Sequence, residues 1–454
     1  MLKRILIANR GEIAMRVIRA ARQLGIETVL VYSSEDADSK PVRFADRAVC
    51  VGGPSAAKSY LNMESIIQTA VSCRCEAIHP GYGFLSENAA FAEKCGENGI
   101  VFIGPKPEVI RMMGDKQSAR RLMKERGVPT VPGSDGLLSD AAEAGRIAAR
   151  VGYPVLLKAT SGGGGRGMRA AGNEKELAGA FDSASAEAAS AFGDGRLYLE
   201  KLIVRPRHIE VQILGDHFGN MVHLGERDCS LQRRNQKMIE EAPAFGIDEK
   251  TRLGIREAAV SAASAAGYTG AGTVEFVLDS ENRYYFIEMN TRIQVEHPVT
   301  EMVSGADIVR EQLLIASGEK ISFAQEDVGF SGAAIECRIN AEDAARDFMP
   351  CPGTVRGLQF PCGAGIRVET ALFPGARISP WYDSMIAKLI VHAENRTEAI
   401  RKMTLALEET AVDGVPTNIR FLQGIMKDGE YLEGRVDTGF IGRFADRHGK
   451  EGAG

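Results

Sequence analysis

The chain has 454 residues, of which 44% are hydrophobic and 25% are charged, and its formal net charge is −5. These values are typical of a globular protein of about three domains, and the charge balance does not favour a nucleic-acid or anionic-membrane partner. No apolar run approaches the roughly 20 residues of a membrane span. Eight cysteines without paired Cys-x-x-Cys spacing, and a start without signal-peptide character, predict reduced thiols in a cytoplasmic protein.

The first segment has the pattern of a strand, a helix and a second strand. Apolar runs of strand length cover residues 4–8 and 28–32, and Gly25 is a helix stop signal between them. Apolar residues recur at helical spacing at Ile13, Val17, Ala21 and Leu24. The turn at residues 9–12 lacks the glycines of a dinucleotide site. Residues 1–113 are therefore predicted to form a Rossmann-like N-terminal domain without that site.

A run of glycines follows a predicted strand. Residues 155–170 read VLLKATSGGGGRGMRA. Glycine lets a backbone approach phosphate groups closely, although a flexible linker has a similar composition. The P-loop pattern fails because Met168 and Arg169 stand where Lys-Ser/Thr is needed, and a dinucleotide loop opens directly into a helix. The next helix starts only near residue 174, so the order of strand, loop, short strand and helix favours a hairpin that closes over phosphates as a lid.

Two further units follow the N-terminal domain. Residues 114–203 are predicted to form the lid domain, with an alanine-rich helix from 174 to about 192 and a strand at 196–200. Residues 204–446 are predicted to form a larger unit with strands at 209–214, 221–224, 272–278 and 284–289. Residues 447–454 are expected to be a disordered tail.

The stretch FIEMNTRIQVEH, residues 286–297, places a polar side chain at every second position. These positions are Glu288, Asn290, Arg292, Gln294 and Glu296. In an extended chain such residues share one face, which is also the pattern of an ordinary strand with its polar face in water. A turn centred on residues 281–282 places Glu275 opposite Glu288, and like charges directly opposed destabilise a sheet. The two carboxylates and the Asn290 amide oxygen suit magnesium, which removes that repulsion.

Other residues supply the groups that a nucleotide and a small anion need. Lys116 and Lys158 are candidates to neutralise phosphate charge. The guanidinium fork of Arg292 matches a planar oxyanion, and Glu296 is a candidate base two residues beyond Gln294. ATP, magnesium and a planar anion are the substrate set of a ligase that phosphorylates a carboxylate-like anion.

Six separated motifs resemble biotin carboxylase, a family with the ATP-grasp fold. They are HPGYGFLSEN (79–88), KATSGGGGRGM (158–168), DCSLQRRNQKMIEEAP (228–243), EMNTRIQVEHPVTE (288–301), ECRINAED (336–343) and YDSMIAKLI (382–390). The resemblance runs from about residue 5 to residue 419. It implies an α/β (α+β) fold in which a Rossmann-like N-terminal domain precedes a glycine-rich lid domain, the ATP-grasp core and a biotin carboxylase C-terminal domain.

The resemblance also implies a two-stage reaction and a role for each matched residue. ATP phosphorylates bicarbonate to carboxyphosphate, which gives carbon dioxide and phosphate, and the phosphate then deprotonates the ureido nitrogen of biotin. The implied ligands of Mg²⁺ or Mn²⁺ are Glu275, Glu288 and Asn290. The implied bicarbonate and biotin site has Lys237, Arg292, Gln294, the Val295 backbone, Glu296 as base and Arg338 for the biotin enolate. The implied ATP contacts are Lys116, Lys158, Gly163, Gly164, Gly165, Gly167, Glu200, Lys201, Ile203, His208, Gln232, Asn235, Glu275 and Glu288.

The implied partners are a separate biotin carboxyl carrier protein, carboxyltransferase subunits and a second copy of the chain in a homodimer. The chain lacks the Ala-Met-Lys-Met sequence in which carrier domains present biotin. Acetyl-CoA, propionyl-CoA and pyruvate all remain open as the final acceptor, which a separate transferase selects.

One position departs from the family pattern, and two other functions stay open. Asn235 stands where the family commonly has histidine, and asparagine donates a hydrogen bond but carries no charge. The alternatives are another ATP-grasp ligase, such as a carbamoyl-phosphate or purine-pathway enzyme, and a non-catalytic nucleotide-binding subunit. Arg338 argues against the first, and intact Glu296 and Lys237 argue against the second. His297 is as much a structural as a functional candidate.

Overall fold

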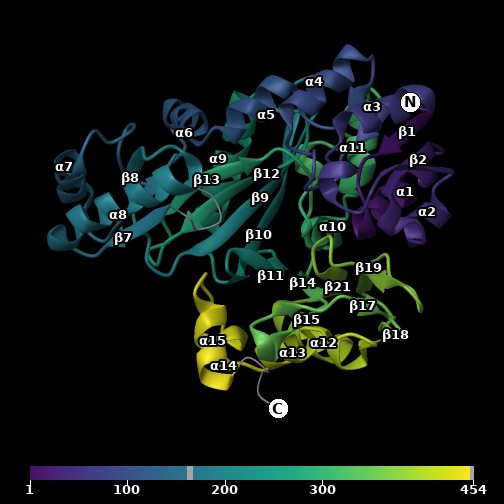
Figure 1. Ribbon diagram of the computed structural model, residues 1–454. Helices are drawn as coiled ribbons and strands as arrows, with labels where there is room; N and C mark the ends of the chain where they lie inside the picture. Colours follow the sequence, from purple (N-terminus) through teal and green to yellow (C-terminus); the bar gives the residue numbers. More distant parts are fainter. Residues whose placement is uncertain (161–166, 450–454) are drawn as a thin grey trace.

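The computed structural model describes residues 1–160 and 167–449 (Figure 1). The N-terminal unit is a five-stranded parallel sheet in the order β3-β2-β1-β4-β5, flanked by helices. Ile5, Leu6 and Ile7 are all 0% exposed, as expected for a parallel strand that is covered on both faces. The strands predicted at residues 4–8 and 28–32 are confirmed. The elements are β1 (Arg4–Ile7), α1 (Gly11–Gln23), β2 (Glu27–Ser33), α2 (Lys40–Phe44), β3 (Arg47–Gly52), α3 (Met63–Ser72), β4 (Ala77–His79), α4 (Ala89–Glu97), β5 (Val101–Phe102) and α5 (Pro107–Gly114).

The lid is a small antiparallel sheet, β7-β6-β8, with two helices against it. Lys158 pairs with Met168 across β6 and β7, so the predicted strand–loop–strand hairpin is confirmed at its two strands. Its tip, residues 161–166, lies outside the described residues. Asn173 caps α8 by accepting hydrogen bonds from the backbone N–H groups of Lys175 and Glu176. The elements are α6 (Lys116–Glu125), α7 (Ala141–Val151), β6 (Val155–Ala159), β7 (Met168–Ala171), α8 (Glu174–Phe192) and β8 (Leu197–Lys201).

The largest sheet has eight antiparallel strands in the order β13-β12-β9-β10-β11-β14-β21-β19. It runs between the N-terminal unit and the lid in Figure 1, and continues into the C-terminal strands. β10 is much longer than predicted, because its second half, residues 225–233, is polar in sequence but largely buried. The strands are β9 (Arg207–Gly215), β10 (Met221–Arg233), β11 (Gln236–Ala242), β12 (Gly270–Leu278), β13 (Tyr284–Asn290), β14 (Ala333–Asn340), β19 (Ile366–Thr370) and β21 (Met385–Ala393).

Helices cover both faces of this sheet. α10 (His297–Ser304) packs on β14 and β21 through Val299 and Val303, next to Ala334 and Ile390. α12 (Arg396–Glu409) packs on the same strands through their alternate residues, including Cys337. The remaining helices are α9 (Glu249–Ala265), α11 (Ile308–Ala316), α13 (Ile419–Met426), α14 (Gly429–Leu432) and α15 (Phe440–His448).

Three two-stranded ladders complete the C-terminal part. They are β15 (Glu342–Asp343) with β16 (Met349–Pro350), β17 (Gly353–Thr354) with β20 (Arg377–Ile378), and β18 (Gly357–Gln359) with β22 (Ala411–Asp413). The expected disordered tail is wrong at its start, because α15 continues through residues 447 and 448 with Phe444 buried beneath it. In the described part of the chain, no helix combines the length and hydropathy that crossing a bilayer requires. All eight cysteines are free.

Candidate active site

β12 and β13 form a hairpin that carries the predicted metal ligands. Glu275 lies directly opposite Glu288, so the predicted juxtaposition of two carboxylates is confirmed. β13 ends at Asn290 and α10 begins at His297. The prediction of one extended strand through Glu296 is therefore wrong, because residues 291–296 form a loop between the strand and the helix.

The loop brings its polar side chains together by hydrogen bonds rather than by strand alternation. Arg292 donates from Nη2 to Asn290 Oδ1 (3.1 Å) and from Nη1 to Gln294 Oε1 (2.8 Å). Gln294 donates from Nε2 to Glu275 Oε1 (3.1 Å), to which Asn290 Nδ2 also donates (2.8 Å). The guanidinium of Arg292 is thus held next to the carboxylate hairpin.

Lys237, on β11, lies among three carboxylates. Its Nζ is 2.6 Å from Glu210 Oε2, 3.0 Å from Glu275 Oε1 and 2.6 Å from Glu296 Oε1. Burial alone lowers the pKa of Lys237, but the three carboxylates together raise this pKa well above its ordinary value. The ammonium group therefore stays charged and is the positive centre of the site.

Glu296 is fully buried between two cations. Its Oε1 faces Lys237, and its Oε2 is 2.9 Å from Arg338 Nη2. Burial raises the pKa of Glu296, but Lys237, Arg338 and Arg227 outweigh that effect and hold the pKa well below its usual range. Arg338 is itself held by Glu240, whose Oε1 is 2.6 Å from Arg338 Nε. The Glu296 carboxylate is thus ionised. Its pKa rises, and it becomes a stronger base, when Lys237 or Arg338 moves away from it toward another anion.

His208, on β9, completes the polar centre. Its Nε2 is 3.1 Å from Glu275 Oε2, and its Nδ1 is 2.8 Å from Gln232 Nε2. Because the amide nitrogen of Gln232 can only donate, the ring proton lies on Nε2 and faces the carboxylate. Burial lowers the pKa of His208, whereas the negative charge of Glu275 raises it, and the net change is upward.

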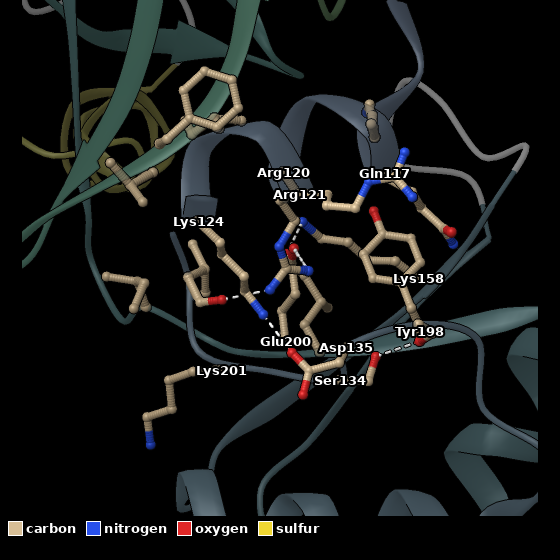
Figure 2. Close-up of a pocket in the computed structure, with 18 of the residues that line it drawn as sticks. Gln117, Arg120, Arg121, Lys124, Ser134, Asp135, Lys158, Tyr198, Glu200 and Lys201 are labelled. Carbon is tan, nitrogen blue, oxygen red and sulfur yellow. Dashed lines mark hydrogen bonds and ion pairs between the residues drawn. The ribbon is translucent and has the colours of Figure 1, made fainter. Parts of the chain in front are cut away.

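A cavity of about 610 Å³ lies between α6, the lid sheet and the β12–β13 hairpin. Figure 2 shows its polar side, where Lys158 and Arg120 converge on one carboxylate: Lys158 Nζ is 2.5 Å from Glu200 Oε2, and Arg120 Nη1 is 2.9 Å from Glu200 Oε1. Apolar lining comes from Val277, Phe286, Ile287, Ile203 and Leu156. A concave apolar wall with charged groups at its edge is a setting that suits a nucleotide base and its phosphates.

Family models match the chain in three consecutive pieces. The N-terminal domain of biotin carboxylase matches residues 1–110, the ATP-binding domain of the carbamoyl-phosphate synthase L chain matches residues 115–324, and the C-terminal domain of biotin carboxylase matches residues 336–443. The biotin carboxylase of Nostoc sp. is 53% identical over 438 residues, which are 96% of this chain and 98% of that protein. The chain belongs to the biotin carboxylase family. It is therefore grouped with ATP-dependent ligases.

Solved structures agree with this biotin carboxylase assignment. The biotin carboxylase of Campylobacter jejuni, in a complex with β,γ-ATP, has a TM-score of 0.93 at 48% identity and covers 98% of this chain and 99% of its own. The biotin carboxylase domain dimer of the Hydrogenobacter thermophilus 2-oxoglutarate carboxylase, in complex with MgADP, ADP and bicarbonate, has a TM-score of 0.92 at 51% identity and covers 100% of both chains. Only the middle family model is named for carbamoyl-phosphate synthase, so the two flanking models argue against that alternative.

The biotin carboxylase fold brings some predicted residues together and leaves others apart. Lys116, Lys158, Glu200, Lys201 and Ile203 line the cavity. Within that set, Lys201 directs its Nζ to the carbonyl groups of residues 152 and 153, at 2.9 and 2.6 Å. Three of the predicted phosphate-loop residues, Gly163, Gly164 and Gly165, lie outside the described residues, whereas Gly167 has a φ of +71° directly before β7.

Asn235 lies in the tight turn between β10 and β11. Arg234 and Asn235 both have positive φ angles, of 50° and 63°, and asparagine tolerates this left-handed conformation better than most residues. Arg234 Nη2 is 2.6 Å from Asp347 Oδ2, and the Arg233 guanidinium lies 4.2 Å from the ring centre of Phe348. The turn is thus attached to the C-terminal part of the chain, and asparagine suits its backbone.

Several residues of the site escaped the sequence analysis. Glu87 accepts a hydrogen bond from Arg292 Nε (3.0 Å) and from the Thr291 backbone N–H (3.0 Å). Glu210 and Glu240 hold Lys237 and Arg338. The two-residue spacing of His208 and Glu210 at the start of a predicted strand was a usable signal, and Glu87 lies inside the first family motif. No spacing pattern pointed to Glu240.

The carboxylate hairpin fits a divalent cation. Glu275 and Glu288 are opposed. The Asn290 amide, whose nitrogen faces Glu275, would add its oxygen after a half-turn, which completes a donor set that magnesium accepts. Burial and then the charge of Glu275 raise the pKa of Glu288, as expected for two carboxylates on opposed strand positions. Lys116 Nζ is 3.9 Å from Glu288 Oε2, a distance that leaves room for a closer positive partner.

Proposed function

We propose that this chain carboxylates biotin on a separate carrier protein, with ATP and bicarbonate as its other substrates, at the site centred on Lys237. One observation carries the assignment of roles. The fully buried carboxylate of Glu296 contacts both Lys237 and Arg338, next to the hydrogen bonds that join Arg292, Gln294 and Glu275. A base, an anion site and a metal hairpin therefore meet at one point.

Arg292, Gln294 and Lys237 are proposed to bind bicarbonate. The guanidinium of Arg292 presents two edges, one of which is occupied by Glu87 through Nε. Its Nη atoms face Asn290 and Gln294, so an incoming anion exchanges with neutral acceptors rather than with a carboxylate. Such an exchange is less costly than displacing a charged partner.

Glu296 is proposed to take the proton of bicarbonate. An oxygen of the resulting anion attacks the γ-phosphorus of ATP, the bond to the ADP oxygen breaks, and carboxyphosphate forms. Lys237 lies within hydrogen-bond distance of Glu296, so a shift of the ammonium toward the substrate anion removes part of the charge that keeps the Glu296 pKa low. Binding of bicarbonate thereby raises the basicity of the group that deprotonates it.

Arg338 is proposed to stabilise the biotin enolate. It is fixed on one side by Glu240 and on the other by Glu296, and its pKa is raised above its ordinary value by these carboxylates despite burial, which alone lowers it. When Glu296 takes up a proton, the Nη2 edge of Arg338 loses its anionic partner. The guanidinium is then free to meet the negative oxygen of deprotonated biotin.

ATP is proposed to bind in the 610 Å³ cavity, with its base against Val277, Phe286 and Ile203. Lys116 and Lys158 are placed for its phosphates. Glu275, Glu288 and Asn290 would hold magnesium, which neutralises phosphate charge when bound. His208 and Gln232 support this hairpin through the contact of His208 with Glu275.

The partners are proposed from the relatives. A carrier protein must bring biotin to the site, a carboxyltransferase must use the product, and a homodimer is favoured by the dimer of the 2-oxoglutarate carboxylase domain. A solved structure of the biotin carboxylase subunit of pyruvate carboxylase is 51% identical, so the family match leaves the final acceptor open. The cytoplasmic location expected from the cysteine pattern stays a prediction, which cell fractionation tests.

Free biotin is the simplest test substrate. The purified chain should release phosphate from ATP at a rate that requires both bicarbonate and biotin, and it should transfer ¹⁴C from bicarbonate to biotin. Phosphate release that depends on bicarbonate and ammonia, but not on biotin, would favour a carbamoyl-phosphate ligase instead. Nucleotide binding without any turnover would favour the non-catalytic subunit.

A further inference from the structure

The loop of residues 291–296 carries the proposed bicarbonate groups but has no strand or helix of its own. Among the described residues, the backbone N–H groups of residues 292–296 find no protein acceptor, and those of Val295 and Glu296 are the two nearest to α10. Glu296 is also the N-cap residue of α10, so both N–H groups lie where the positive end of a helix begins. Two successive free N–H groups bind an anion only if the peptides that carry them are held in a fixed orientation.

His297 holds the first of these peptides. Its Nδ1 is 2.7 Å from the carbonyl oxygen of Gln294, and the ring is fully buried. Because a carbonyl can only accept, Nδ1 carries the proton and donates it. Burial, with the nearby cations of Lys388, Arg16 and Arg367, lowers the pKa of His297 well below its usual value, so the ring is neutral and Nδ1–H is its only donor.

Lys388 holds the second peptide from another part of the chain. It lies on β21, directly opposite Arg338 on β14, and its side chain is 0% exposed. Its Nζ donates to the carbonyl oxygen of Val295 (2.8 Å) and is 3.1 Å from Glu12 Oε1. An ammonium group buried to this extent needs such partners, and Glu12 supplies the opposite charge from α1.

In a trans peptide the C=O and N–H bonds point in opposite directions. A donor that holds the Gln294 oxygen therefore turns the Val295 N–H away from His297, and a donor on the Val295 oxygen turns the Glu296 N–H away from Lys388. We propose that His297 and Lys388 are positioning residues that orient these two N–H groups toward bicarbonate. The inference rests on the proposed function, because it adds two backbone N–H groups to the bicarbonate site proposed for the side chains of Arg292 and Lys237.

Histidine 297 allows a matched pair of substitutions. The amide nitrogen of asparagine replaces Nδ1 of histidine, whereas that of glutamine replaces Nε2. His297→Asn should keep the KM for bicarbonate within about threefold of wild type. His297→Gln should raise it about tenfold, which corresponds to about 1.4 kcal/mol, because the Gln294 carbonyl loses the side-chain donor at 2.7 Å and keeps only the backbone N–H of residue 297 at 3.3 Å. Lys388→Met should raise the same KM by about tenfold or more, and Lys388→Arg should restore part of the loss. The KM for ATP should stay within about twofold in all four variants.

The steady-state assay uses free biotin and measures kcat, the KM for bicarbonate and the KM for ATP. Thermal unfolding of each variant shows whether it is folded, and the His297 pair keeps the test decisive if Lys388→Met is unstable. Equal bicarbonate KM values for His297→Asn and His297→Gln, or a parallel rise in the KM for ATP, would overturn the positioning role while the proposed function stands. A wild-type chain without turnover that depends on bicarbonate contradicts the proposed function and this inference together.

Discussion

Replacing Lys237 with methionine tests the electrostatics of the site most directly. The substitution keeps most of the apolar length of the side chain but removes the one ammonium that contacts Glu210, Glu275 and Glu296. These carboxyl groups are 0%, 7% and 0% exposed, so their charges stay buried. Removal of one partner from a buried ion pair costs roughly 3–5 kcal/mol, and we expect the free energy of unfolding to fall by about that amount at pH 8.

The loss should shrink as the pH is lowered. In the wild type, Lys237 holds the pKa of Glu275 and of Glu296 below the usual value, so the stability that these two groups contribute is fully present above about pH 5 and is lost only at lower pH. Without the ammonium, desolvation and mutual repulsion raise at least one of these pKa values above the unfolded value. Native protein then binds more protons than unfolded protein, and stability falls with rising pH by up to about 1.4 kcal/mol per pH unit for each such group.

Urea denaturation between pH 5.5 and 8 measures this effect as the difference between variant and wild type. The comparison removes the pH dependence that both proteins share. The pKa of Glu240 is raised to about 7 by burial and is lowered in part by Lys237, so removal of the ammonium raises it further and adds to the loss in the same direction. Lys201→Met is the matched control, since the partners of Lys201 are two neutral carbonyl groups and its loss should not depend on pH. A destabilisation by Lys237→Met that is the same at pH 5.5 and pH 8 would refute the reasoning.

Three further predictions concern activity and composition. Glu296→Gln or Arg292→Ala should abolish the ATP cleavage that depends on bicarbonate, whereas ATP binding, measured by calorimetry, should survive. Near wild-type carboxylation of free biotin by either variant would contradict the assigned roles. Asn235→His should change the KM for ATP by less than about tenfold, because a neutral hydrogen bond contributes only about 0.5–1.5 kcal/mol. The substitution should add no pH dependence of this KM between pH 6 and 8. A larger fall in the KM at low pH would show that charge is missing at this turn. The purified chain should be negative on a streptavidin blot, and a positive band would show that it carries biotin itself.

The opposition of Glu275 and Glu288 was predictable, but not for the reason that produces it. Leu278 pairs with Tyr284 and Phe276 with Phe286, so the turn is centred on residue 281. That centre alone would place Glu275 one residue away from Glu288. A bulge between Glu275 and Phe276 shifts the ladder by one residue and restores the pairing. Alternation and turn signals carry no information on bulges, so the sequence reached the right pair through the wrong register.

The loop after Asn290 shows a second limit of prediction from sequence. Alternating polar residues predicted a strand, whereas the chain turns into α10, because Pro298 at the start of the helix and the buried His297 and Val299 favour a helical turn there. The convergence of Arg292 and Gln294 on the hairpin depends on tertiary contacts. Partners such as Glu87 and Lys388 lie about 100 to 200 residues away in the chain. A local sequence pattern does not predict contacts between residues so far apart.

The continuous eight-stranded sheet limits how this protein can be rearranged. Strands β9 to β13 carry the nucleotide hairpin, and β14, β19 and β21 belong to the C-terminal part, yet β11 and β14 share backbone hydrogen bonds from Ala242–Ala334 to Ile239–Cys337. A recombinant fragment that stops between these strands exposes an unpaired sheet edge, which invites self-association. Chimaeras between relatives should therefore exchange residues 204–446 as one block rather than half of this sheet.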